Sequence, residues 1–209
     1  MKKLIATALL SAPLLALAGP VNLLGNGSFD GDAIGASSWT VSNSPKSWTP
    51  GTNGMELRNN VAGTAFDGSN FVELDGYGNG SISQTVATVV GQWYTLSFEY
   101  SNRTGTDPST NGLAWSFGNS SGDAPALAKN VSADNVWQLY STTVQATASQ
   151  TTLTIWATGT SDSYGSSLDA VSLSAVPEPQ TWALLAAGFV ALGVTTALRR
   201  RQAQPARAK

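Results

Sequence analysis

The stretch Trp93-Tyr-Thr-Leu-Ser-Phe-Glu-Tyr100 decides the fold class of this chain. Within it the apolar residues Tyr94, Leu96 and Phe98 alternate with polar ones, so the two kinds of side chain fall on opposite faces of an extended segment. A period of two is typical of a β-strand with one buried face. We therefore start from a strand at residues 93–100 whose apolar face is turned toward a core.

The same alternation recurs on both sides of this strand. Clusters of Gly, Asn and Asp, such as residues 75–80 and 104–109, separate the alternating segments, and the sequence shows no amphipathic helix between them. Further strands are predicted at residues 71–74, 81–86, 113–117, 136–144, 151–156 and 168–173. Strands at this spacing favour an all-β fold with a single β-sandwich domain, while the order of the strands stays open.

Composition removes several classes of function. The chain has 209 residues but contains no Cys and no His. This excludes disulfides, thiolate nucleophiles, zinc–thiolate sites, haem sites and Ser-His-Asp catalysis. Residues 19–175 carry four basic and twelve acidic side chains, a net charge of −8. A domain this acidic offers no basic groove, so we expect no nucleic-acid partner.

The N-terminal residues have the three parts of a secretory signal peptide. Lys2 and Lys3 precede an apolar run, which closes on the small-residue site Ala16-Leu17-Ala18. The alternative, a buried helix, is opposed by Pro13 and by the charged start. We expect residues 1–18 to direct the chain to the secretion machinery, and residues 19–175 to form the extracytoplasmic domain.

The C-terminal residues predict a membrane helix. Residues 182–198 form a stretch of 17 residues without a charge, and Arg199, Arg200 and Arg201 follow at once. A helix of this length rises about 26 Å, just enough for a thin hydrocarbon core. A basic cluster on one side keeps that side in the cytoplasm. We expect a transmembrane helix at 182–198, a basic tail at 199–209 that stops transfer, and the domain outside.

Pro177, Glu178 and Pro179 stand just before that stretch. The order of Pro-Glu-Pro, short apolar helix, Arg cluster and chain end, over residues 176–209, resembles the PEP-CTERM sorting signal of Gram-negative bacteria; the same tail is also labelled an ice-binding-protein C-terminal domain. The resemblance implies export across the inner membrane and processing near Pro-Glu-Pro by exosortase, with these three residues as the motif that is read. It also implies a place at the cell surface or in the exopolysaccharide matrix of a biofilm.

Several short motifs of the domain occur in a familiar order, at residues 22–30, 67–76, 82–86, 91–98 and 167–173. Together they resemble the galactose-binding-like jelly rolls, a fold shared by many carbohydrate-binding modules. The resemblance implies a structural calcium ion that bridges the first and last strands through Asp30 and Asp169, with Asp32 as a further ligand. Calcium takes six to eight oxygen ligands and needs neither His nor Cys. The alternative is that these aspartates cap turns.

The domain holds six Trp residues, and aromatic rings are typical of sugar-binding surfaces as well as of sandwich cores. Trp93 and Trp156 are opposite in phase to their apolar neighbours, and Trp48 lies in a loop between two prolines. We therefore take Trp48, Trp93 and Trp156 as exposed candidates for ligand binding. The remaining three, which we expect in the core, are Trp39, Trp115 and Trp137.

These observations predict a non-catalytic module that binds polysaccharide, with neutral glycan favoured by the acidic domain. The alternative is a purely structural matrix or coat protein without a discrete ligand. A glycan hydrolase is less favoured, because no signature pairs any two of the available acids, Glu56, Glu73, Asp75 and Glu99. Ice binding is also less favoured, because the Thr residues between 142 and 154 form no regular repeat. We expect no cofactor other than structural calcium.

Overall fold

The computed structural model describes residues 21–177. The predicted signal peptide, most of the Pro-Glu-Pro motif, the predicted membrane helix at 182–198 and the Arg cluster lie outside this part of the chain. Within residues 21–177, no helix is both long enough and apolar enough to cross a bilayer.

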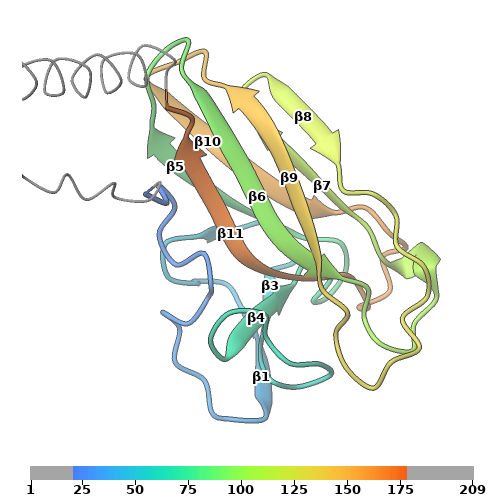
Figure 1. The fold of residues 1–209 in the computed structure, drawn as a ribbon. Coiled ribbons are helices and arrows are strands. Elements are labelled where there is room, and N and C mark those ends of the chain that lie inside the picture. Colours follow the sequence, from blue (N-terminus) through green and yellow to red (C-terminus); the bar gives the residue numbers. More distant parts are fainter. Residues whose placement is uncertain (1–20, 178–209) are drawn as a thin grey trace, which may run out of the picture.

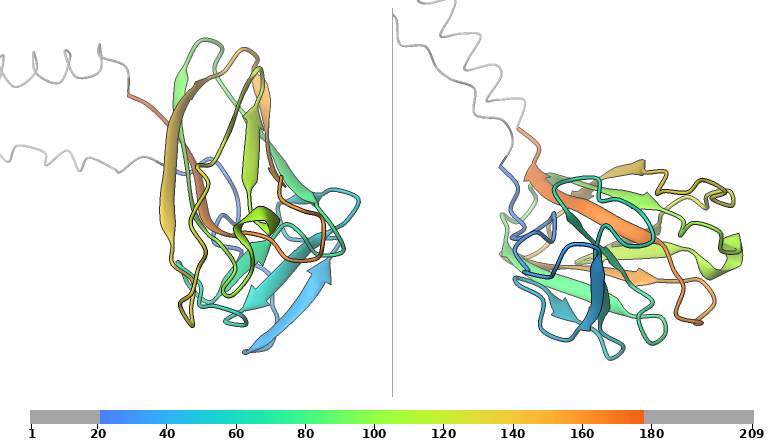
Figure 2. Two further views of the ribbon diagram at one scale, coloured as in Figure 1. Left: turned by 90° about the vertical axis from the view of Figure 1, so that its right-hand side faces the viewer. Right: turned by 90° about the horizontal axis from the view of Figure 1, so that it is seen from below.

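The domain is a two-sheet β-sandwich with one short 3-10 helix (Figures 1 and 2). Its elements in chain order are β1 (Ser38–Ser42), β2 (Thr49–Pro50), β3 (Met55–Asn59), β4 (Asn70–Glu73), β5 (Ser81–Ala87), β6 (Trp93–Ser101), η1 (Pro108–Thr110), β7 (Leu113–Phe117), β8 (Ser120–Asp123), β9 (Gln138–Gln145), β10 (Gln150–Ala157) and β11 (Ser167–Ala175).

Strand order is strongly non-sequential. One sheet has six strands in the order β1-β3-β4-β11-β6-β9, and the other has five in the order β2-β5-β10-β7-β8. All of the paired strands are antiparallel. The last strand, β11, lies in the middle of the first sheet and pairs with both β4 and β6. The sheet is therefore complete only when the C-terminal strand of the domain has joined it. This arrangement is consistent with a jelly roll.

The core lies between the two sheets. Leu96 and Phe98 of β6 belong to the core together with Leu153 and Ile155 of β10, a strand of the other sheet, and all four side chains are fully buried. Their polar neighbours along each strand face outward, as the period of two requires. Complete burial of one such side chain stabilises the fold by about 1.5–3 kcal/mol. The layers therefore follow directly from the alternation in the sequence.

The all-β prediction is confirmed, and each of the seven predicted strands overlaps an observed one. Four strands were not predicted: β1, β2, β3 and β8. Of these, β3 matters most for function. Met55 and Leu57 of β3 are buried on the core side, whereas the intervening Glu56 and Arg58 face the opposite side of the sheet.

Strand β11 contains a bulge that reorients one acidic side chain. Its register against β6 shifts between Asp169 and Ser172, and Ala170 in the bulge has a φ of 49°. The Ala170 N–H donates to Asp169 Oδ1 over 2.6 Å. A bulge of this kind bends the strand and changes the direction in which a side chain points.

Candidate functional site

A cleft of about 410 Å³ lies on the outer side of the six-stranded sheet, over β1 and β3. Its walls combine aromatic, charged and small side chains. The lining residues are Trp39, Val41, Glu56, Arg58, Val61, Gly76, Tyr77, Arg103, Asp162, Ser163 and Tyr164.

Strand register builds the floor of this cleft. Trp39 on β1 lies directly opposite Arg58 on β3, while Glu56 lies between Val41 on β1 and Glu73 on β4. Directly opposite residues of an antiparallel pair have their side chains on the same face. The floor is therefore two adjacent rows of side chains, on the face of the sheet that is turned away from the core.

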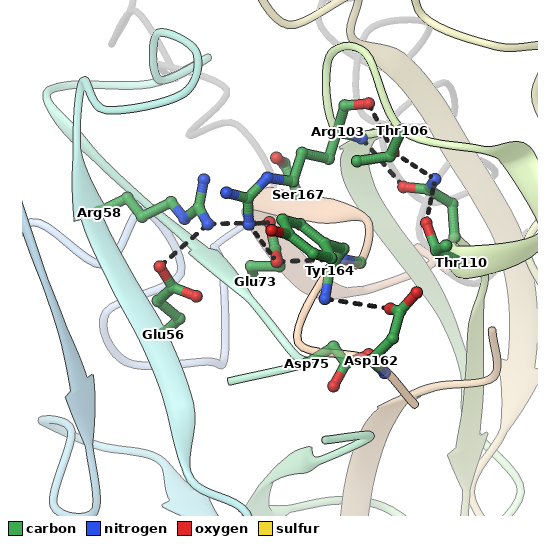
Figure 3. A network of polar contacts seen from close by, with 12 residues as sticks. Glu56, Arg58, Glu73, Asp75, Arg103, Thr106, Thr110, Asp162, Tyr164 and Ser167 are labelled. Carbon is green, nitrogen blue, oxygen red and sulfur yellow. Dashed lines mark hydrogen bonds and ion pairs between the residues drawn. The ribbon is translucent and has the colours of Figure 1, made fainter. Parts of the chain in front are cut away.

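The charged residues of the floor form one ion-pair network (Figure 3). Arg58 Nη2 lies 2.9 Å from Glu56 Oε1 and 3.3 Å from Glu73 Oε2, and Arg103 Nη1 lies 3.0 Å from Glu73 Oε1. The side chains of Arg58 and Glu73 are almost completely buried, and that of Arg103 is 20% exposed. Opposite charges alternate along the network, so the four side chains balance one another.

Glu73 is the centre of the network. Besides the two guanidinium groups, the backbone N–H of Gly165 donates to its Oε1 over 3.0 Å. Burial raises the pKa of the Glu73 carboxyl from its ordinary value of 4.5 to about 7, although Arg58 and Arg103 act in the opposite direction. The desolvation of the Glu73 carboxylate, which raises its pKa, therefore outweighs the two guanidinium groups, which lower it.

Arg58 holds unused hydrogen-bond donors. Its Nη2 serves Glu56 and Glu73, but Nε and Nη1 are buried and have no partner among residues 21–177. A buried donor without an acceptor costs about 1–3 kcal/mol, so native proteins leave few of them. Arg58 therefore holds two enclosed N–H donors beneath the surface of the cleft, whereas Arg103, which is 20% exposed, presents its guanidinium to the cleft.

The loop between β10 and β11 forms one wall of the cleft. The Tyr164 ring lies 4.6 Å from the Arg103 guanidinium carbon in a cation–π contact. Two hydrogen bonds fix this loop. The Asp162 N–H donates to Asp75 Oδ2 over 3.2 Å, and within the loop Asp162 Oδ1 accepts from the Tyr164 N–H over 3.2 Å. Desolvation raises the pKa of the buried Asp75 carboxyl. Tyr164 is thus held in place by both its ring and its backbone.

A compact turn after β6 positions Arg103. Its backbone N–H donates to Asn111 Oδ1 over 2.9 Å, and its carbonyl accepts from the Thr106 hydroxyl over 2.9 Å (Figure 3). The Asn111 amide then donates to the Thr106 hydroxyl over 3.0 Å. These bonds fix the backbone from which the guanidinium reaches across to Glu73.

Three aromatic side chains form the rim of the cleft. Tyr77 is 75% exposed, Trp39 57% and Tyr164 47%. Exposed rings around a floor with fixed polar groups can bind a ligand that has both apolar faces and hydroxyl groups.

The predictions for individual Trp residues are partly right. Trp93 is 49% exposed and Trp156 is half-buried with its ring outward, as expected, and Trp115 lies in the core as expected. Trp48 was expected to be exposed, which is wrong: it is 4% exposed, its ring packs on Phe29, and its Nε1 donates to the Asn26 carbonyl over 3.0 Å. Neither Trp93 nor Trp156 lines the cleft.

Two Trp residues expected in the core lie elsewhere. Trp39 is on the edge strand β1, whose outward face forms the floor of the cleft, so its ring is exposed instead of packed between the sheets. Trp137 is half-buried beside β9, where Phe71 contacts it edge-on on the outer side of the sheet. A core position for these two rings is therefore wrong.

Asp30 and Asp169 do come together, at a turn that precedes β4. Asp169 Oδ2 accepts from the N–H groups of Phe66 and Asp67 over 2.8 and 3.0 Å. Asp30 Oδ1 accepts from the N–H groups of Ser69 and Asn70, each over 3.0 Å. Burial raises the pKa of the Asp169 carboxyl to about 7, against the hydrogen bonds that it accepts.

Asp32 binds a different loop. Its Oδ1 accepts from the Lys46 N–H over 2.9 Å, and its Oδ2 accepts from the Asn26 amide over 2.8 Å. In the described part of the chain, no three acidic side chains gather in a way that would hold a metal ion. The three aspartates do not fit a calcium site as they stand, because N–H groups occupy Asp30 Oδ1 and both carboxylate oxygens of Asp169 and Asp32.

The acids considered for hydrolysis are partly brought together. Glu56 and Glu73 lie opposite each other on β3 and β4, but both are engaged by the Arg58 guanidinium, and Glu73 is fully buried. Glu99 lies opposite Leu139 on β9, away from the cleft. Glycoside hydrolysis requires two carboxyl groups that flank the scissile bond. Among the residues that line the cleft, Asp162 is the one carboxylate outside the ion-pair network.

Sequence reasoning did not single out Arg58, Arg103, Tyr77 or Tyr164. A signal for Arg58 was present in Met55-Glu-Leu-Arg58, where apolar and charged residues alternate with a period of two. Opposite charges two residues apart on one strand face indicate an ion pair on that face. The sequence holds no comparable signal for the other three, because they lie in loops.

Comparison with known families gives two matches. The family described as protein of unknown function (DUF642) matches residues 22–174, and the PEP-CTERM protein-sorting motif matches residues 175–201. The second match confirms the sorting signal and indicates an exported, exosortase-sorted protein. No curated protein matches the chain.

Solved structures share the fold at low sequence identity. The stig cyclase Fisc from Fischerella sp. TAU is 17% identical, with a TM-score of 0.58 over 76% of this chain and 99% of the cyclase. A family 35 carbohydrate binding module from Clostridium thermocellum is 14% identical, with a TM-score of 0.44 over 65% of this chain and 97% of the module. The first likeness supports the fold, and neither one carries an argument about activity.

Proposed function

This chain belongs to the DUF642 family, and on that premise we propose that its domain is a non-catalytic module that binds neutral polysaccharide in the cleft over β1 and β3. The observation that carries the proposal is the combination of an exposed aromatic rim with a fixed polar floor, in which the Arg103 side chain is 20% exposed. Sugar rings present C–H faces and hydroxyl groups side by side, which is what these two features bind.

The size of the cleft agrees with this proposal. Pockets that bind small ligands usually have volumes of about 300–1,000 Å³, mostly apolar walls and a few fixed polar groups. The cleft, at about 410 Å³, has Trp39, Tyr77 and Tyr164 as its aromatic surfaces. One or two sugar units of a longer chain would occupy it, and the rest of the polysaccharide would continue into solvent.

Charge favours a neutral ligand. The charges of Glu56, Arg58, Glu73 and Arg103 alternate and compensate within the floor. The domain as a whole carries −8, so an anionic polysaccharide would be repelled unless cations bridged it. Hydroxyl groups, in contrast, can bind beside these paired charges without a change in the charge balance.

Among the residues that line the cleft, no two carboxyl groups are free to act as an acid pair, which favours binding over catalysis. Glu73 lies below Arg103 and is fully buried, and Glu56 is paired with Arg58. A hydrolase needs one carboxyl group as acid and another as base or nucleophile, both at the substrate. Asp162 alone does not meet that requirement.

The sorting motif supplies the cellular context. It indicates an exported, exosortase-sorted protein of the cell surface. We further propose that the chain crosses the inner membrane of a Gram-negative bacterium, that residues 182–198 anchor it, and that exosortase processes it near Pro177, Glu178 and Pro179. The bound polysaccharide would then be exopolysaccharide of the cell's own surface or matrix.

An array of neutral and acidic glycans, together with pull-down by the organism's exopolysaccharide, tests the proposal. We expect retention on neutral glycans that salt does not abolish, because stacking and hydrogen bonds to neutral groups depend little on ionic strength. No retention in either assay would favour the alternative, a purely structural matrix or coat protein without a discrete ligand.

Trp93 and Trp156 stay predicted ligand contacts, and they provide a matched comparison. Each lies on an outward strand face away from the cleft. If retention depends on Trp156 and not on Trp39, the binding surface is the outer face of the five-stranded sheet, and the cleft is not the site.

A further inference from the structure

The end of the domain at which β11 finishes carries exposed apolar side chains. Val89 and Val90, in the turn between β5 and β6, are 66% and 64% exposed, and Trp93 at the start of β6 is 49% exposed. The Val176 N–H donates to the Trp93 carbonyl over 2.9 Å, and the Gln92 amide donates to the Val176 carbonyl over 2.7 Å. The apolar turn is therefore fixed directly beside the point where the chain leaves the domain (Figure 1).

A second turn belongs to the same end. The N–H of Gly91 donates to the Ala146 carbonyl over 2.8 Å, and the N–H of Ala146 donates to the Gln92 carbonyl over 3.0 Å. These bonds join the β5–β6 turn to the β9–β10 turn. The two turns and the end of β11 thus form one surface, which we call the tail-end surface.

The tail-end surface has no charged side chain. Its turns and strand ends are residues 86–95, 143–152 and 173–177, and none of them is Asp, Glu, Lys or Arg. The four basic and twelve acidic residues of the domain all lie in other segments. Although the domain has a net charge of −8, this neutral and partly apolar surface is not itself repelled by an anionic bilayer.

The sequence keeps this surface close to the membrane. Only five residues separate Val176 from Trp182, the first residue of the uncharged stretch 182–198. An extended chain gains at most about 3.3–3.6 Å per residue, so this linker spans about 20 Å. While residues 182–198 are in the bilayer, the tail-end surface therefore cannot move far from the headgroups.

We propose that the tail-end surface seats in the lipid headgroup region while the tail is uncut, with Val89 and Val90 inserted and Trp93 at the boundary. The inference rests on the proposed membrane anchoring by residues 182–198. A Trp ring with an apolar body and an N–H donor suits that boundary, and two adjacent Val side chains suit the outermost acyl region. Insertion of a single turn binds a membrane only weakly. Removal of the tail would therefore release the domain from the membrane.

This seating would orient the processing motif. Pro177 follows directly after Val176, which Trp93 and Gln92 hold. With Val89 and Val90 in the headgroup region, Pro177 leaves the domain in a fixed orientation to the bilayer. A membrane-embedded processing enzyme would then approach the motif from one direction.

Site-specific fluorescence tests the proposal on the full chain, since the chain has no Cys and a single added Cys can be labelled cleanly. The chain is reconstituted into phosphatidylcholine–phosphatidylglycerol vesicles that contain lipids spin-labelled near the headgroup. We expect the label on Val90→Cys to be quenched at least about threefold more than a label on Ser121→Cys, a matched position on the exposed edge strand β8. Equal quenching at the two positions would overturn the proposal.

A third position separates this proposal from the one on which it rests. Val190→Cys lies within the uncharged stretch, and deep spin labels should quench it if that stretch is inserted. Quenching at position 190 without quenching at position 90 would leave the anchor intact and refute the seating. Protection of position 90 only in vesicles that contain the processing enzyme would identify that enzyme, not lipid, as the partner of the tail-end surface.

Discussion

Asp30 and Asp169 hold the two ends of the same turn. Asp169 accepts from the N–H groups at residues 66 and 67, and Asp30 accepts from those at residues 69 and 70. Gly68, with a φ of +69°, sits between them, and a Cβ there would lie 1.6 Å from Asp30 Oδ2. Residues near the start and the end of the domain are thus joined through a turn in its middle, which leads directly into β4 and the floor of the cleft.

Removal of the Asp30 carboxylate should loosen this turn. Hydrogen bonds to a charged group contribute about 1.5–3 kcal/mol, and partial exposure of Asp30 reduces that contribution. We expect Asp30→Ala to lower the free energy of unfolding in urea by about 2 kcal/mol, because the N–H groups of Ser69 and Asn70 lose their acceptor. Asp123→Ala, on the exposed edge strand β8, is the control and should change it by less than about 0.5 kcal/mol.

Gly68→Ala provides an independent check on the same contact. Its Cβ would meet Asp30 Oδ2, so Gly68→Ala should destabilise the wild type more than it destabilises the Asp30→Ala variant. The residual loss in the double variant reflects the positive φ alone. Strict additivity of the two changes would show that Asp30 does not lie against Gly68 in solution.

Calcium dependence tests the other role predicted for these aspartates. Because backbone N–H groups point at the carboxylate oxygens of Asp30 and Asp169, we expect the same melting temperature in chelator and in excess calcium. A fall in melting temperature with chelator, abolished in Asp169→Ala, would establish the calcium site instead. Isothermal titration with calcium alone gives a second readout that does not depend on unfolding.

Stability should fall as the pH rises toward neutrality. Burial raises the pKa of the Glu73 carboxyl from 4.5 to about 7, so between these values the folded state binds more protons than the unfolded state. Unfolding then releases protons, and the free energy of unfolding decreases with rising pH through that window. We expect a higher melting temperature at pH 5 than at pH 8 at constant ionic strength.

Glu73→Gln isolates this contribution. Repulsion among the acidic residues of the domain also decreases as the pH falls, which stabilises the folded state at low pH. Wild-type data alone therefore do not identify the group responsible. The variant cannot titrate at position 73, and its melting temperature should change less between pH 5 and pH 8. A slope equal to that of the wild type would assign the pH dependence to other carboxyl groups.

Intact-mass analysis of protein from cells and medium tests the sorting route. A product that ends near residues 177–179, and that is lost in a sortase-deficient strain, is expected from the family match. Replacement of both Pro177 and Pro179 by Ala should leave the tail in place. A wild-type mass that still includes residues 199–209 would make the tail a permanent anchor.

The sequence predicts the strands that have a clear period of two. In β6 and β10 the apolar residues alternate with Thr, Ser and Glu, so the period is plain. The short strand β3 is not predicted, because its outward positions, Glu56 and Arg58, are charged and only two apolar residues, Met55 and Leu57, show the period of two. Strand phase puts Glu73 on the same face as Phe71 and on the opposite face from Leu74, and the structure agrees.

The candidate site was beyond sequence reasoning for a different reason. Glu56 and Glu73 lie on the neighbouring strands β3 and β4, but Arg103, in the turn after β6, meets Glu73 only because β11 pairs with both β4 and β6. That strand order has no local signal. The exposure of Trp39 and Trp48 could not be predicted for the same reason. Trp39 lies on an edge strand and Trp48 lies under a folded loop, and the local alternation of apolar and polar residues indicates neither position.

The most direct test of the central claim is titration of the first neutral oligosaccharide retained on the array into three forms of the full chain: wild type, Trp39→Ala and Trp156→Ala. Loss of the exposed Trp39 ring should raise the Kd about tenfold, which corresponds to about 1.4 kcal/mol of stacking. The account predicts that Trp156→Ala binds like the wild type. An unchanged Kd for Trp39→Ala would contradict the assignment of the cleft as the binding site.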